Sequence, residues 1–481
     1  MSASNIHYAS IKEIHCLYNN RALTVRELVL AFLSRISEVD RGSGGLNSIL
    51  EINPDVLFIA DSFDEKLRNG AELTPLFGIP VLIKDNISTN DRMRTSAGSL
   101  ALADNYARYD AHIVKLLRNA GAVILGKTNM TEFANYMSRE NMPSGYSSRG
   151  GQVMNPFNKD ITPSGSSSGS AVAVAAGLCT AAIGTETSGS IISPAGYNGI
   201  VGIKPTLGLV GRSGIIPISS AFDTAGPMTR TVTDAAVVLG VIAGGDPRDP
   251  ATGAVGPELL SDYAEDIDKS GLEGIKIGVF KSGGEDNSIC AIEKKAAFER
   301  LCGIISGAGA LLIRDIDIAF DYKMSRIMRN EFKACMNSYL STLDRNYRIR
   351  TLKDIIEFNQ ANASEALKYG QSILIDAQNN TSGNLTEREY IEELVEREAI
   401  IKKFDKVFTD NDVDIILCDS LTSIAPYTGF PSMTIPIGQR QDRIPIDSIW
   451  IARRFDEAKI IKAAYAAEKL LSMNLKPEIN N

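Results

Sequence analysis

Two serine-rich turns are candidate catalytic segments of this sequence. The first, residues 165–170 (GSSSGS), contains Ser166 and precedes small apolar residues that predict a helix packed in the core. The free N–H groups and the positive end of a helix start could stabilise a serine alkoxide or an oxyanion. Taken alone, such serines could equally be helix caps in a solvated turn.

The second turn, residues 184–190 (GTETSGS), ends in Ser190. The preceding Gly189 lets the backbone come close to a ligand, and consecutive N–H groups in such a turn can form an oxyanion hole. A purely structural turn is the alternative that this segment leaves open by itself.

The third candidate is Lys84, near the end of the almost entirely apolar stretch 77–85 (FGIPVLIKD), which predicts a strand buried on both faces. Burial disfavours the charged form of an amine, so a buried Lys84 would lose proton affinity and could accept a proton near neutral pH. A solvated lysine at a strand end is the alternative.

Histidine and cysteine patterns argue against other catalytic classes. The chain has three histidines, His7, His15 and His112, and none is near a serine motif in the sequence, which disfavours a Ser-His-Asp triad and a zinc site. The six cysteines are scattered without a CxxC pair, as in proteins of a reducing compartment. We therefore expect free thiols, no metal and no cofactor.

Composition disfavours several classes of partner. The 481 residues are 44% hydrophobic and 22% charged, with a net charge of −8, which is ordinary for a globular protein. An acidic balance without a basic stripe disfavours nucleic acid. Neither an apolar run of ~20 residues nor a signal-peptide pattern is present. The expectation is a cytoplasmic protein with no nucleic-acid and no membrane partner.

Predicted strands and helices alternate along the chain, which indicates the α/β class. Residues 24–27 form a capping box that predicts a helix start, and residues 386–389 predict another. Strands are expected at 123–125, 275–280 and 412–418, and a closing helix at 456–471. These elements must position the two serine turns and the lysine.

Three of these segments together resemble the amidase signature family. They are residues 162–177 (TPSGSSSGSAVAVAAG), 184–195 (GTETSGSIISPA) and 77–87 (FGIPVLIKDNI). Supporting matches occur at 126–133, 198–208 and 223–230, and weaker ones at 429–438 and 454–468. Several motifs in the family's order are far more specific than any one of them.

The resemblance implies a role for each candidate. Ser190 matches the family's nucleophile, Ser166 its bridging serine and Lys84 its general base, which makes a Ser-Ser-Lys triad. In relatives a cis peptide bond precedes the bridging serine, so one is expected between Gly165 and Ser166. The backbone oxyanion hole matches Thr187, Ser188, Gly189 and Ser190.

The resemblance also implies the fold: a large mixed β-sheet core covered by helices on both faces. We expect a single amidase domain over residues 1–481, with a signature core at about 75–240, a helical variable region at about 285–408 and the C-terminal part of the core at 409–475. The implied activity is hydrolysis of a small-molecule or peptide carboxamide through an acyl-serine, by a monomer or homodimer.

Departures from the family pattern indicate which branch of the family this sequence resembles. Many relatives have glycine at the position of Ser188, and many A-type subunits of tRNA-linked amidotransferases have arginine at the position of Ile192. The motif is more similar to the peptide amidase branch. The link 419–429 is shorter than usual, and residues 443–447 replace a usual hairpin, which suggests a more open site.

Three other functions stay open at this point. An A-type amidotransferase chain would release ammonia from glutamine for a partner chain. An acyl-transfer enzyme of specialised metabolism would keep the acyl-serine but exclude water. A binding protein without catalysis is disfavoured because Lys84, Ser166 and Ser190 are all present.

Overall fold

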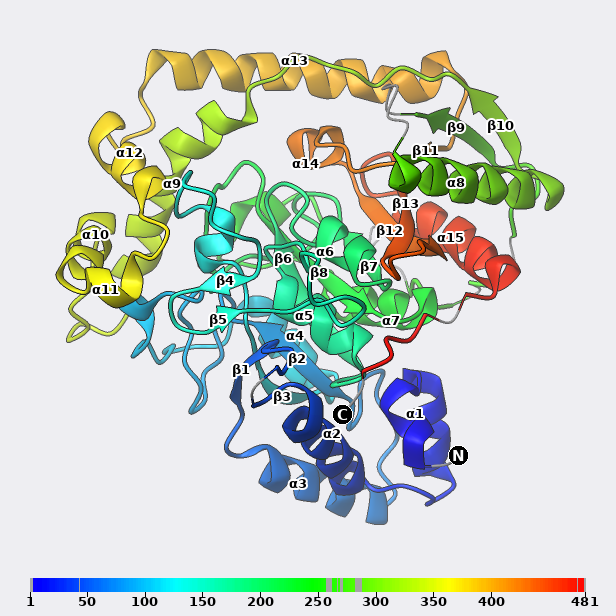
Figure 1. Ribbon diagram of the computed structural model, residues 1–481, viewed down its shortest axis with the longest axis horizontal. Helices are drawn as coiled ribbons and strands as arrows, with labels where there is room; N and C mark the ends of the chain where they lie inside the picture. The colour runs from blue at the N-terminus through cyan, green and yellow to red at the C-terminus, as the bar shows by residue number, and fades with distance from the viewer. Residues whose placement is uncertain are drawn as a thin grey trace.

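The computed structural model describes residues 3–42, 44–256, 262–265, 267–268, 271–281, 288–473 and 475–479. Its centre is one mixed β-sheet of eleven strands (Figure 1). Across the sheet the strands are β1 (Ile49–Ile52), β3 (Val123–Thr128), β2 (Pro80–Lys84), β6 (Ala181–Glu186), β8 (Thr224–Thr229), β7 (Val201–Lys204), β12 (Ser432–Gln439), β13 (Pro445–Ala452), β11 (Ile415–Cys418), β9 (Lys276–Phe280) and β10 (Leu311–Arg314).

Strand directions place the ends of two central strands together. β2 runs parallel to β6, with Val81, Leu82 and Ile83 paired to Ala181, Ala182 and Ile183. Both strands are buried along their whole length, as their apolar sequences predict. Since β2 ends at Lys84 and β6 at Glu186, two charged side chains meet at the carboxyl edge of the sheet, where α/β proteins commonly bind ligands.

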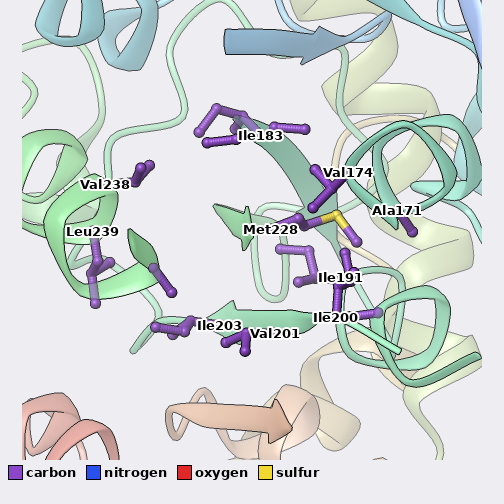
Figure 2. Close-up of a cluster of buried hydrophobic side chains, with 14 of the residues drawn as sticks. Ala171, Val174, Ile183, Ile191, Ile200, Val201, Ile203, Met228, Val238 and Leu239 are labelled. Atoms are coloured by element: carbon purple, nitrogen blue, oxygen red, sulfur yellow. The ribbon is translucent and has the colours of Figure 1, made fainter. Parts of the chain in front are cut away.

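Two groups of helices cover this part of the sheet. α5 (Ser168–Ala175) packs on β6 and β2, whereas α7 (Val232–Ile242) packs on β8 and β7. Figure 2 shows Val174 of α5 and Leu239 of α7 on opposite sides of the intervening strands. The mixed sheet between helical layers confirms the predicted α/β class and the expected sheet core covered by helices on both faces.

The remaining helices lie around this centre. Within the described residues they are α1 (Ile11–Asn19), α2 (Val25–Val39), α3 (Val56–Arg68), α4 (His112–Asn119), α6 (Ile192–Tyr197), α8 (Ile289–Gly307), α9 (Met324–Ser341), α10 (Leu352–Ala361), α11 (Ala363–Ala366), α12 (Ser372–Asn380), α13 (Arg388–Asp410), α14 (Ile424–Thr428) and α15 (Glu457–Leu471). The long helix α13 crosses the top of the molecule in Figure 1, above α14. It packs on α9 and α14 and leads into β11.

Local signals predicted some boundaries and missed others. Thr24 caps α2 in a capping box with Glu27, as predicted. The capping box predicted at 386–389 is wrong, because the N-cap of α13 is Glu387 and its side chain makes no capping bond. Segment 443–447, noted only as a departure, includes the first three residues of β13, which pairs antiparallel with β12 and β11. All six cysteines are free thiols, as expected.

Candidate active site

Lys84 lies at the carboxyl end of β2 with no exposed surface. Its Nζ donates hydrogen bonds to Ser166 Oγ at 2.8 Å, Ser167 Oγ at 2.9 Å and the Thr185 carbonyl oxygen at 3.1 Å. Burial lowers the pKa of this amine from 10.5 to about 7, because water no longer stabilises the charged form. Lys84 can therefore exchange a proton with a serine hydroxyl near neutral pH.

Ser166 and its neighbours connect the lysine to the second turn. The Gly165–Ser166 peptide bond is cis, as the resemblance implied. The Ser166 carbonyl accepts a hydrogen bond from the Thr131 N–H at 3.1 Å, and the Ser167 N–H donates to the Ser190 carbonyl at 3.2 Å. The two serine turns are thus joined through their backbones directly beside the buried amine.

Ser190 is 8% exposed and lies at the end of the turn after β6. Within the described part of the chain its hydroxyl makes no hydrogen bond, whereas the Ser166 hydroxyl is held by Lys84. The hydroxyl of Ser190 is therefore free to turn toward a substrate or toward Ser166. The structure brings Lys84, Ser166 and Ser190 to one site, although they are far apart in sequence.

The turn from Thr187 to Ser190 contains unpaired backbone donors. Gly189 has a φ of +83°, in the left-handed region that favours glycine. None of the four N–H groups of Thr187, Ser188, Gly189 and Ser190 has an acceptor among the described residues. Free backbone donors of this kind could form an oxyanion hole.

Two carboxylates hold this turn, that of the buried Glu186 and that of the half-buried Asp223. Glu186 Oε2 accepts hydrogen bonds from the N–H groups of Ile191 at 2.8 Å and Ile192 at 3.1 Å, so its side chain spans the turn from one end to the other. Asp223 Oδ1 accepts from Thr187 Oγ1 at 2.6 Å. These bonds fix the conformation in which the four N–H groups stay free.

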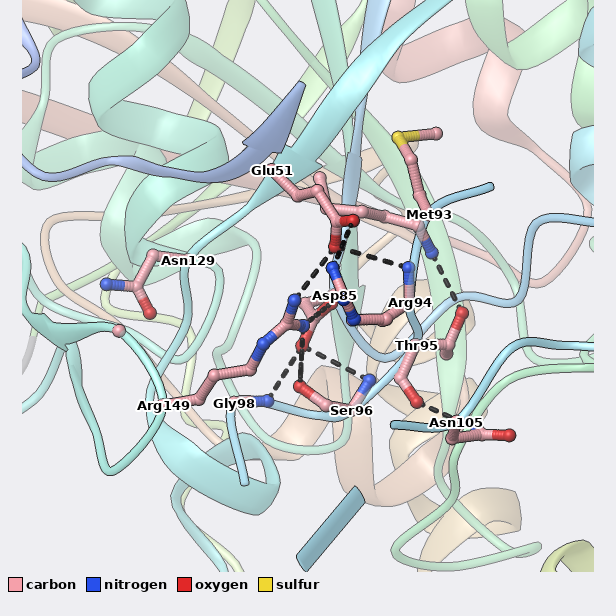
Figure 3. A network of polar contacts seen from close by, with 12 residues as sticks. Glu51, Asp85, Met93, Arg94, Thr95, Ser96, Gly98, Asn105, Asn129 and Arg149 are labelled. Atoms are coloured by element: carbon pink, nitrogen blue, oxygen red, sulfur yellow. Dashed lines mark hydrogen bonds and ion pairs between the residues drawn. The ribbon is translucent and has the colours of Figure 1, made fainter. Parts of the chain in front are cut away.

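A separate ionic network anchors the residue after Lys84 (Figure 3). The Asp85 carboxylate accepts hydrogen bonds from the Ser96 N–H and hydroxyl, from the Gly98 N–H at 3.0 Å and from Arg149 Nη1 at 3.3 Å. Arg149 also donates to Glu51 Oε2 at 2.8 Å. Burial raises the pKa of the Asp85 carboxyl, and Arg149 opposes that shift. The network fixes the end of β2, and hence the position of the lysine backbone.

A cavity of about 570 Å³ opens beside the turn. Thr185, Glu186 and Thr187 line it on one side, and Ile216 and Ala334 are among the residues that line it elsewhere. It has room for a small organic group, and of the four candidate oxyanion residues Thr187 lines it.

Sequence reasoning missed several residues of this site. Ser167 was not distinguished from its neighbours in the triple serine, although it bonds to the lysine. Glu186 and Asp223 lie inside motifs quoted for the resemblance, but no local pattern showed that their side chains bind the turn. Nearness to the nucleophile motif was the one available signal, and it gives no geometry.

The histidines make their contacts elsewhere. His7 packs edge-on against Phe32, His15 Nε2 lies 3.2 Å from the Phe77 carbonyl oxygen, and His112 lies 3.8 Å from a carboxylate oxygen of Asp246. Across the described ranges, no group of three or more His, Cys, Asp or Glu residues could hold a metal ion. Over the same ranges, no helix is long and apolar enough to cross a membrane.

The comparisons with a family model and with known proteins agree on the family of this chain. The amidase family model matches residues 27–426. A protein of Arabidopsis thaliana described as a probable amidase is 35% identical over 99% of this chain and 93% of its own length. The A-type chain of the glutamyl-tRNA(Gln) amidotransferase of Alkaliphilus metalliredigens is 33% identical over 97% of each chain.

A solved structure agrees in fold over nearly the whole chain. The peptide amidase from Stenotrophomonas maltophilia superposes with a TM-score of 0.91 and 36% identity, covering 98% of this chain and 99% of its own. Together with the family match, this similarity shows that the chain belongs to the amidase family of hydrolases, which act on amide carbon–nitrogen bonds.

Proposed function

We propose that this chain hydrolyses a carboxamide, such as a C-terminal peptide amide, to the acid and ammonia through an acyl-serine on Ser190. The observation that carries the proposal is the Lys84 amine, buried with a pKa of about 7 and 2.8 Å from the Ser166 hydroxyl. A general base is most effective when its pKa lies near the working pH.

The proposed first step moves one proton along two hydroxyls. Neutral Lys84 takes the proton of Ser166, and Ser166 takes the proton of Ser190 as the Ser190 oxygen attacks the carbonyl carbon. The resulting oxyanion accepts hydrogen bonds from the N–H groups of the turn that ends at Ser190, each typically contributing ~3 kcal/mol.

The proposed later steps reverse the proton path. The amide C–N bond breaks, and Lys84 returns its proton through Ser166 to the leaving nitrogen, which departs as ammonia. A water molecule then attacks the acyl carbon and gives a proton to the same relay, which returns it to the Ser190 oxygen as the acyl C–O bond breaks, so that the acid is released and the Ser190 hydroxyl is restored. The cavity beside Thr187 supports binding of part of the acyl group there.

Two departures in the turn support a free-standing amidase over a chain of an amidotransferase complex. Ile192 differs from the arginine of many tRNA-linked relatives, Ser188 differs from the glycine of many relatives in the family as a whole, and the motif is more similar to peptide amidases. The 33% identity to the A-type chain of an amidotransferase favours the second candidate, glutamine hydrolysis for a partner chain. Glutaminase assays and gel filtration distinguish the two functions.

The test uses a fluorophosphonate and peptide amides. Wild type is expected to be labelled on Ser190 and to release ammonia from a peptide amide, whereas Ser190→Ala should do neither and remain folded. Ser62→Ala, which changes an exposed serine on α3, is the matched control and should behave as wild type. Undiminished ammonia release by Ser190→Ala would refute the assignment.

A further inference from the structure

The short link after β11 lies over the oxyanion turn. Residues 419–423 connect β11 to α14, and within this link Leu421 contacts Gly189. A β-carbon placed on Gly189 would lie 2.9 Å from Leu421 Cδ2 and 3.6 Å from its Cδ1. The two methyl groups of Leu421 therefore lie against the backbone whose N–H groups are free.

Leu421 is nevertheless 47% exposed. A single exposed leucine is ordinary on a protein surface, but this one borders a catalytic turn whose Ser188 is also exposed. The contact with Gly189 covers one side of the side chain and leaves the other open to solvent. An apolar surface is thus available directly beside the candidate oxyanion hole.

The link is held firmly at its far end. All five residues of α14 are buried, and the ring of Tyr427 stacks on Tyr322 with centroids 4.3 Å apart. The Gly429 N–H bonds to the Ala425 carbonyl at 2.9 Å and closes the helix. These contacts fix the end of the link that follows Leu421.

We infer that Leu421 determines specificity: it contacts the acyl part of the substrate and selects apolar groups next to the scissile carbonyl. The inference depends on the proposed function. Because the leaving group, ammonia, contains no carbon, any substrate carbon that contacts Leu421 belongs to the acyl part. An acyl side chain that covers the open half of Leu421 removes apolar surface from water, and so favours the acylation transition state.

The test compares N-acetyl-leucinamide with N-acetyl-glycinamide. In Leu421→Ala, the ratio of kcat/KM for the leucine amide to kcat/KM for the glycine amide should fall about 5-fold. About half of the Leu421 side chain is exposed in the free enzyme, and the substrate can no longer bury that apolar surface in the variant. Leu421→Asp should lower the ratio further. Leu470→Ala, which changes an exposed leucine on α15, should leave the ratio unchanged. Urea midpoints of all variants should match wild type, which separates selectivity from folding.

A second measurement does not depend on amide turnover. The alkyl chain of a fluorophosphonate occupies the acyl position, so the octyl-to-ethyl ratio of labelling rates at Ser190 should also fall about 5-fold in Leu421→Ala. Unchanged ratios in both assays would overturn the inference while leaving the proposed function intact. Failure of the proposed function would instead appear as no labelling of Ser190 in wild type.

Discussion

Replacing Lys84 by methionine should abolish activity and yet alter stability in a pH-dependent way that reports the buried amine. Its pKa in the folded protein is about 7, against 10.5 when exposed. Between these values the unfolded chain binds one more proton than the folded chain, so this group makes the free energy of unfolding rise with pH. Lys84→Met removes that dependence.

The size of the effect follows from the two pKa values. Each tenfold change in a protonation equilibrium corresponds to ~1.4 kcal/mol. At pH 6 the lowered pKa of Lys84 destabilises the folded state by ~5 kcal/mol. At pH 9 it still does so by ~2 kcal/mol, because the amine of the unfolded chain is largely charged there and must lose its proton on folding. The hydrogen bonds that Lys84 donates offset part of this cost at both pH values.

The assay is urea unfolding of wild type and Lys84→Met at pH 6 and pH 9. The difference in hydrogen bonding between the ammonium and the neutral amine is part of the shifted pKa, so the change in stability with pH reports the ionisation of Lys84. The stability of the variant relative to wild type should be about 3 kcal/mol more favourable at pH 6 than at pH 9. An equal difference at the two pH values would show that Lys84 titrates normally and would refute the proposed base.

Four other outcomes are expected. The wild-type kcat/KM, followed by ammonia release, should fall tenfold per pH unit below about pH 7, as Lys84 becomes protonated; a flat profile would contradict this. Gly189→Ala should lower kcat at least tenfold, because its φ of +83° strains an alanine. Glu186→Gln should lower kcat more than it raises KM, because the turn loses charged hydrogen bonds. Arg149→Met should lower the free energy of unfolding by ~3 kcal/mol, measured in urea, since buried Asp85 loses its ion pair with Arg149 and keeps only the nearby charge of Lys127.

The residues of the proposed triad could be found from sequence because each lies in a local pattern. An apolar run predicts a buried strand, and Lys84 is buried at its end. The triple serine shows the limit of such patterns, since its members are alike in sequence. In the fold Ser166 and Ser167 bond to Lys84, whereas Ser168 Oγ turns away and donates to the Ser164 carbonyl at 2.5 Å.

Contacts between distant segments could not be predicted in this way. The bond from Thr187 to Asp223 depends on β6 and β8 pairing antiparallel. The contact between Leu421 and Gly189 depends on where residues 419–423, which connect β11 to α14, pass the turn. Such contacts are set by tertiary packing, and neither the 3.6-residue nor the 2-residue periodicity records them. The short link itself was visible in the sequence, but its leucine had no local signal.

The pKa of Lys84 results from opposing effects, and this gives the two carboxylates of the turn a second role. Burial lowers the pKa of the amine, whereas the charges of Glu186 and Asp223 raise it. The same carboxylates hold the backbone around the oxyanion donors. Removing the charge of Glu186 should therefore move the acid limb of the rate profile to lower pH, as well as lowering kcat. A purely structural role would lower the rate at every pH and leave the limb where it is.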